Sequence, residues 1–97
     1  MTSEELSKQL SQALVDTKAL DVKTYDVRGK SGIADFFVVA TGSAAPHLKA
    51  LVKALPKAYR VSGDPESGWI VADYFDVVVH VFSPEARAYY ALEKLWE

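Results

Sequence analysis

The sequence feature that most constrains the fold is the stretch from Trp69 to Phe82. It contains two runs of β-branched and aromatic residues, Trp69–Ala72 and Val77–Phe82, which flank the polar and aromatic segment Asp73–Asp76. Two such runs around a short break are typical of a β-hairpin. A further continuous apolar run, Phe36–Ala40, has the composition of a central strand that is covered on both faces. The chain is therefore predicted to build a sheet around these strands.

Helices are predicted on either side of these strands. The first spans about residues 2–18, where Thr2 and Glu5 have the spacing of a capping box. The second is predicted to begin with Ser43 as its N-cap, and Pro56 should kink or end it because proline lacks the amide hydrogen that the helix needs. A third helix is predicted after the hairpin. The expected buried positions are Leu6, Leu10, Ala13 and Leu14 in the first helix, Leu48, Leu51, Val52, Leu55 and Tyr59 in the second, and Ala88, Leu92 and Leu95 in the third.

The remaining segments complete a compact α/β fold. Asp21–Arg28 alternates in a way that predicts a strand, and a short strand is expected to open at Val61. Gly29–Gly32 contains the Gly-Lys-Ser that ends a phosphate-binding loop, but position 24, where that motif requires a glycine, is Thr24, so a plain turn is favoured. The predicted fold is a single domain over residues 1–97, a compact sandwich of a mixed central β-sheet with flanking helices.

Composition excludes several classes of protein. The chain of 97 residues has no cysteine, which removes disulfides and thiolate metal sites. It has no apolar run of the roughly 20 residues that a membrane helix needs, and its polar, acidic start is unlike a secretory signal. A cytoplasmic protein, or the mature form of a protein of an organelle matrix, is expected. The net charge of −2 argues against sequence-independent nucleic-acid binding.

The charges fall into two blocks along the chain. Residues 36–63 contain four basic side chains and no acid, whereas residues 61–86 contain five acids and no Lys or Arg. Two solvated faces would explain this distribution. An acidic block that steers a basic partner would explain it equally well.

Catalytic and metal-binding motifs are not recognisable in the sequence. The two histidines, His47 and His80, have no nucleophile motif beside them, and His80 lies in a strand where a hydrogen-bonded core histidine is favoured over a catalytic base. Asp73, Asp76 and His80 lack the spacing of a metal site. Gly42-Ser43 resembles the start of a nucleotidyltransferase site, but no Asp-x-Asp pair follows it within twenty residues. No enzyme activity, cofactor or metal is predicted.

Five motifs in colinear order resemble the ribosomal silencing factor family, also called the Iojap family. Each motif alone is weak, but the five together span nearly the whole chain. They are Asp26–Ser31, Ala34–Ser43, Trp69–Asp73, Asp76–Phe82 and Arg87–Trp96.

The resemblance implies binding rather than catalysis. It implies a fold related to nucleotidyltransferases without their active site. It also implies docking on the large ribosomal subunit through the basic fourteenth protein of that subunit, which blocks joining of the small subunit and represses translation. A homodimer is implied as well, with no membrane and no sequence-specific nucleic acid among the partners. A nucleotidyltransferase-like enzyme and an interaction module with a non-ribosomal partner remain the alternatives.

The residues of the hairpin supply a candidate docking site. Trp69 has the size of an apolar anchor, although a core position would suit it too. Asp73 and Asp76 could pair with Lys or Arg of a partner or cap the turn, and Tyr74 could add an amphipathic contact. Phe75 stands where members of the family usually carry glycine, so it should alter the turn or add exposed apolar surface. These five residues form the predicted partner-binding site.

Overall fold

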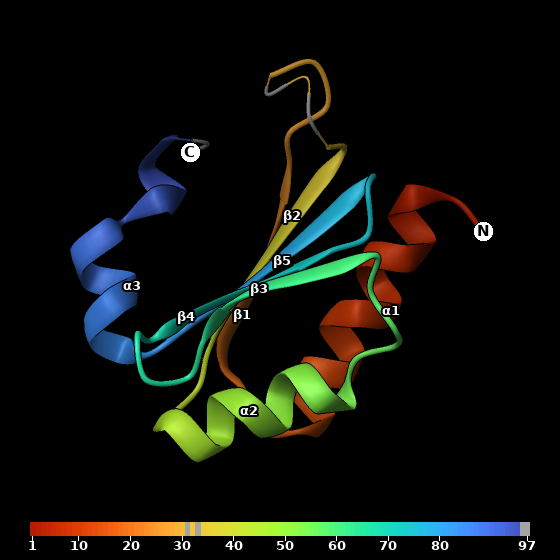
Figure 1. The fold of residues 1–97 in the computed structure, drawn as a ribbon. Helices are drawn as coiled ribbons and strands as arrows, with labels where there is room; N and C mark the ends of the chain where they lie inside the picture. Colours follow the sequence, from red (N-terminus) through yellow and green to blue (C-terminus); the bar gives the residue numbers. More distant parts are fainter. Residues whose placement is uncertain (31, 33, 96–97) are drawn as a thin grey trace.

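The computed structural model describes residues 1–30, 32 and 34–95, and its core is one mixed sheet (Figure 1). The strand order is β1-β2-β5-β4-β3; β2 and β5 are parallel, and the other neighbours are antiparallel. The predicted mixed sheet with flanking helices is confirmed. The elements are α1 (Ser3–Asp16), β1 (Leu20–Asp26), β2 (Phe36–Thr41), α2 (Ala45–Ala54), β3 (Arg60–Asp64), β4 (Trp69–Asp73), β5 (Val77–Phe82), α3 (Pro84–Tyr90) and the 3₁₀ helix η1 (Leu92–Leu95).

The two most apolar strands lie next to each other at the centre of the sheet. Every residue of β2 and of β5 is buried, and for β2 the continuous apolar run Phe36–Ala40 predicted this cover on both faces. The hairpin of β4 and β5 is also confirmed, with Trp69 opposite Phe82 and Asp73 opposite Val78. In Figure 1, α1 and α2 cover one face of this sheet, and α3 lies on the other.

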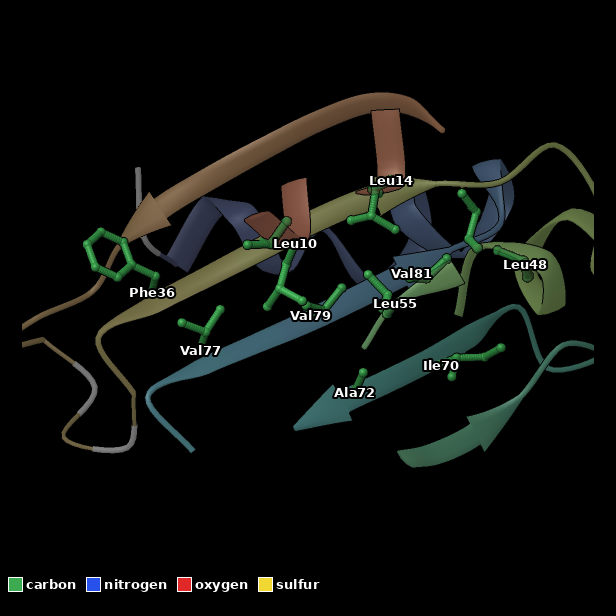
Figure 2. Packing of buried hydrophobic residues seen from close by; sticks show 13 residues of the cluster. Leu10, Leu14, Phe36, Leu48, Leu55, Ile70, Ala72, Val77, Val79 and Val81 are labelled. Atoms are coloured by element: carbon green, nitrogen blue, oxygen red, sulfur yellow. The ribbon is translucent and has the colours of Figure 1, made fainter. Parts of the chain in front are cut away.

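Helix α1 forms as its sequence predicts. The Thr2 hydroxyl accepts a hydrogen bond from the Glu5 N–H, and the Glu5 carboxylate accepts one from the Thr2 N–H, which completes the capping box. Leu10 and Leu14 are fully buried in the main core, where they meet side chains of α2, β4 and β5 (Figure 2). This core fixes the sheet that carries the candidate site.

The start of α2 differs from the prediction. Ala44, not Ser43, is the N-cap, and no side chain accepts a hydrogen bond from the first turn in the manner of a cap. His47 instead reaches back, so that its Nδ1 accepts the Ser43 N–H at 2.9 Å while its Nε2 lies 2.8 Å from the Thr17 carbonyl oxygen. Ser43 lies one residue too early to cap the helix. The imidazole of His47 connects this turn to the end of α1.

The end of α2 follows from Pro56. The helix stops at Ala54, before the proline could enter its hydrogen-bond ladder, so the predicted early end is confirmed. Tyr59 therefore lies beyond the helix and is 63% exposed, and its predicted place on the apolar stripe of α2 is wrong. The broken helix frees Tyr59 to join the surface described below.

The C-terminal segment is shorter and more bent than predicted. Ser83 caps α3 by accepting the Ala86 N–H, but the helix ends at Tyr90, because Ala91 adopts a left-handed conformation (φ 48°). Consequently Ala86 is buried, Ala88 is exposed and Leu95 is 73% exposed, so the predicted buried positions 88 and 95 are wrong.

Arg87 attaches this segment to the sheet. Its guanidinium donates to Glu93, to the Thr41 hydroxyl at 2.8 Å and to the Asp21 carbonyl oxygen at 2.7 Å. The hydrogen bond from Arg87 lowers the pKa of Glu93, so the pair stays ionised at neutral pH. Within the described residues, no helix has the length and apolarity required to cross a membrane.

Candidate partner-binding site

The structure separates the five predicted site residues into two groups. Asp73, Tyr74, Phe75 and Asp76 lie together in the turn between β4 and β5, whereas Trp69 begins β4 at the far end. At about 3.3 Å per residue, four steps along the strand place Trp69 about 13 Å from Asp73. Because side chains alternate along a strand, both point to the face of the sheet that carries α3. The four turn residues therefore form a group separate from Trp69.

Trp69 is neither a free surface anchor nor a fully buried core residue. Its side chain is partly exposed and packs on the small cluster around Phe82, with ring centroids 5.2 Å apart. The ring of Tyr90 in α3 also lies beside the indole, with centroids 4.6 Å apart, and is 6.3 Å from the ring of Phe82. The indole N–H donates to Nδ1 of His80 at 3.2 Å. Trp69 thus contributes to the packing between α3 and the sheet while keeping part of its ring accessible.

His80 is a core histidine, as its strand position predicts. It is 9% exposed, and its Nδ1 accepts the Trp69 N–H, which places the ring proton of the neutral form on Nε2. Burial lowers the pKa of His80 to about 4, so the ring is neutral at physiological pH. The side chain stacks beside Phe82 and meets the edge of Phe37. These contacts make His80 part of the packing that orients Trp69.

The turn holds Phe75 in an unusual conformation. Phe75 has a φ of 68°, in the left-handed region that non-glycine residues rarely adopt. Two hydrogen bonds fix the turn: the Asp73 carboxylate accepts the Phe75 N–H at 2.8 Å, and the Val77 carbonyl accepts the Tyr74 N–H at 2.9 Å. The ring of Phe75 nevertheless stays 61% exposed. The backbone strain is thus not offset by burial of the aromatic ring.

Tyr59 joins Phe75 on the surface, a pairing that the sequence analysis missed. The two ring centroids are 4.2 Å apart, and both rings are mostly exposed. The signal that could have located Tyr59 was Pro56, which ends α2 three residues earlier. Tyr74, by contrast, points inward: it packs against the main core, and its hydroxyl donates to the Pro56 carbonyl oxygen. Burial raises the pKa of Tyr74.

Neither acid of the turn forms an ion pair with the described residues. Asp76 is exposed, and within the described residues its carboxylate makes no ion pair. Its carbonyl oxygen accepts the N–H groups of Asp35 and Phe36, which anchors this end of the turn to β2. Arg60 faces Asp73 across the strand pair, but the described structure contains no ion pair between them. We call Tyr59, Asp73, Phe75 and Asp76 the acidic turn surface.

The geometry separates this surface from the segment that resembles a nucleotidyltransferase. Gly42-Ser43 follows the carboxyl end of β2, and the Gly42 N–H donates to the Phe82 carbonyl at the end of β5. Asp76 precedes β5 at the opposite end of the same strand pair, seven register steps from Gly42, or about 23 Å away at about 3.3 Å per residue. Among the described residues, no three His, Cys, Asp or Glu side chains converge as metal ligands do. The turn acids therefore lie too far from the Gly-Ser segment to act with it.

Comparison with known proteins agrees with the fold and the motifs. The family described as ribosomal silencing factor during starvation, RsfS, matches residues 1–97. The ribosomal silencing factor RsfS of Halalkalibacterium halodurans is 38% identical over 104 residues, which cover 99% of this chain and 89% of that protein. A crystal structure of a protein from Chromobacterium violaceum superimposes with a TM-score of 0.93 at 32% identity, covering 99% of this chain and 87% of that one.

A eukaryotic relative is found as well. The mouse protein named mitochondrial assembly of ribosomal large subunit protein 1 is 31% identical, over 90% of this chain and 43% of its own length. The relatives thus come from bacteria and from an animal. The chain belongs to the ribosomal silencing factor family.

Proposed function

We propose that this protein binds the large ribosomal subunit through its basic fourteenth protein and thereby blocks joining of the small subunit. The observation that carries the proposal is the acidic turn surface: two exposed aromatic rings beside two carboxylates that lack an ion-pair partner in the described structure. Aromatic side chains are frequent anchors of protein interfaces, and acids complement a basic partner. The name of the mouse relative refers to the large ribosomal subunit.

Blocking requires only that the bound protein occupy space at the subunit interface. Asp73, Phe75 and Asp76 of the acidic turn surface lie at the tip of the β4–β5 hairpin, which pairs with β2 on one side and β3 on the other. The partner therefore meets a preorganised surface. Sucrose gradients of separated subunits, mixed in the presence of the protein, test the proposal. We expect the protein to lower the fraction of joined ribosomes when it is added to large subunits first. An unchanged fraction at saturating protein would contradict the blocking mechanism.

Reversing the charge of Asp76 is expected to weaken large-subunit binding roughly tenfold, about 1.4 kcal/mol, because Asp76→Lys places a cation against a basic partner. Asp76 uses only backbone atoms in the hydrogen bonds of the turn, so the variant should fold normally. The measurement is a titration of labelled protein with large subunits at two salt concentrations. Asp16→Lys, at the exposed end of α1, is the matched control. Equal affinity of the two variants would argue against the acidic turn surface.

Replacing Phe75 by glycine is expected to weaken binding to the large subunit while leaving the stability of the fold nearly unchanged. The change relieves left-handed strain of about 1–2 kcal/mol, but it adds chain entropy of about 0.5–1 kcal/mol and removes an exposed ring contact. These effects nearly cancel, so the free energy of unfolding in urea should change by less than about 1 kcal/mol. Large-subunit affinity should nevertheless fall about tenfold with the loss of an aromatic anchor. The exposed Val15→Ser serves as the control, and unchanged binding by Phe75→Gly would remove Phe75 from the site.

A further inference from the structure

A positively charged surface, opposite in sign to the acidic turn surface, lies where α2 passes the edge strand β3. It is a groove of about 740 Å³ between α2 and the pair β3–β4. Ile70, which is buried, lies beneath it, and Val52 of α2 and Val61 of β3 flank it. Val61 is 52% exposed although it is β-branched and apolar. The groove therefore has an apolar floor and one exposed apolar wall at Val61.

The rim of the groove is positively charged. Lys49 and Lys53 of α2 line it one helical turn apart, and both are exposed. No carboxylate of the described residues lies within ion-pair distance of either lysine, and α2 itself contains no acid. Glu66, in the loop before β4, is the acidic residue in the lining. The two cations on α2 are therefore available to an acidic ligand.

The groove runs beside an open edge of the sheet. β3 is the outermost strand, and all five of its residues are exposed. In an antiparallel pair, only alternate residues of an edge strand direct their N–H and C=O groups to the neighbour, and the others point outward. Such an edge accepts an extended segment as an added strand, and side chains on one face of that segment enter an adjacent groove.

We propose that this groove binds an extended acidic segment of a protein partner, which adds to β3 as a further strand. Two acidic side chains at positions i and i+2, which an extended chain spaces about 6.6 Å apart, would meet Lys49 and Lys53, which one helical turn spaces about 6 Å apart. The next apolar side chain on the same face would meet Val52 and Val61. Single-stranded nucleic acid fits less well, because its binding sites stack bases on aromatic rings and none of the described residues that line this groove is aromatic. The acidic turn surface, in contrast, suits a basic partner, so the two surfaces serve different ligands.

An NMR titration tests the proposal with a defined probe. The probe is acetyl-Thr-Val-Thr-Glu-Thr-Glu-amide, in which the valine and both acids share one face of an extended chain and the acids are two residues apart. We expect saturable amide shifts at Val61 and Ser62 at millimolar peptide, weakening as salt rises. The peptide with lysine in place of glutamate, and a backbone N-methylated version, should each bind at least tenfold more weakly. Absence of saturable shifts would overturn the proposal.

Charge reversal on α2 provides the decisive variant. Lys49→Glu combined with Lys53→Glu should abolish peptide binding, whereas Lys57→Glu, an exposed lysine outside the groove lining, should leave it unchanged. Circular dichroism confirms that each variant is folded. Peptide binding that survives the double substitution would overturn the proposal. The proposal would also be overturned if an oligouridylate binds the unmodified protein but not the double variant, while the peptide binds neither. Large-subunit binding by the double variant should be unaffected, which keeps this test separate from that of the proposed function.

Discussion

Replacing Trp69 by alanine is expected to lower the free energy of unfolding by about 3 kcal/mol, near the low end for removal of a packed tryptophan because the ring is only partly buried. The loss combines the ring contacts with Phe82 and Tyr90 and the hydrogen bond to His80. Urea unfolding monitored by circular dichroism measures it. Removal of the tryptophan is therefore also expected to loosen α3 from the sheet.

Trp69→Phe is the matched variant for this prediction. It retains an aromatic ring against Phe82 and Tyr90 but removes the indole N–H, so His80 loses its hydrogen-bond donor. The expected cost is about 1 kcal/mol, typical of one lost hydrogen bond. If Trp69→Ala costs less than about 1 kcal/mol, the tryptophan is a free surface anchor and the packing role assigned to it is wrong. Because Trp69→Ala perturbs the fold, the turn residues give the cleaner test of docking.

Acidification from pH 6.5 to 4.5 is expected to cost about 2 to 3 kcal/mol of stability through His80. Burial lowers the pKa of His80 to about 4 in the folded protein, whereas the unfolded chain binds this proton near pH 6.5. The unfolded state therefore takes up more protons within this window, and the free energy of unfolding falls as the pH falls. Carboxylates whose pKa is lowered in the folded protein, such as that of Glu93, lose their contribution to stability only at pH values below this window. Urea unfolding at pH 6.5, 5.5 and 4.5 measures the effect.

A variant and a direct titration test whether His80 causes this pH dependence of stability. His80→Asn keeps an acceptor near the Trp69 N–H but removes the titrating ring, so its stability should vary less between pH 6.5 and 4.5. The NMR shift of the His80 ring in the unmodified protein should titrate with a midpoint near 4. A midpoint near the ordinary value for histidine, or an unchanged pH dependence in His80→Asn, would contradict the assignment.

Much of the fold follows from local sequence patterns. The continuous apolar run Phe36–Ala40 located the central strand β2, because strands covered on both faces are apolar at nearly every position. The β-branched and aromatic runs Trp69–Ala72 and Val77–Phe82 located the hairpin of β4 and β5. The capping box of α1 and the Ser83 cap of α3 follow from short-range hydrogen bonding, which depends on spacing alone. The end of α2 followed from the chemistry of Pro56. These features need no long-range information.

The candidate site was harder to predict because it depends on long-range geometry. Trp69 and Asp73 are close in sequence, but an extended strand separates them by about 13 Å. The contact between Tyr59 and Phe75 joins segments sixteen residues apart, and no periodic pattern records it. Likewise, the left-handed Ala91 ends α3 without the glycine that usually signals such a cap. Sequence patterns located the turn, whereas the contact of Tyr59 with Phe75 is visible only in the structure.

The two charged surfaces explain the block distribution of charge along the chain. The acidic block places Asp73 and Asp76 on the turn, and the basic block places Lys49 and Lys53 on α2 beside the edge strand. Asp76, Lys49 and Lys53 are exposed and Asp73 is partly exposed, and none of the four has an ion-pair partner among the described residues. Separate sets of unpaired charge are consistent with two partners of opposite charge.

Co-sedimentation with purified ribosomal subunits tests the central claim most directly. At low salt, the full chain should pellet with large subunits and not with small ones, and Asp76→Lys and Phe75→Gly should both reduce the pelleted fraction. Rising salt should release the protein, because the proposed contact pairs carboxylates with a basic surface. If the unmodified protein remains in the supernatant with large subunits at every salt concentration, the proposed function is wrong.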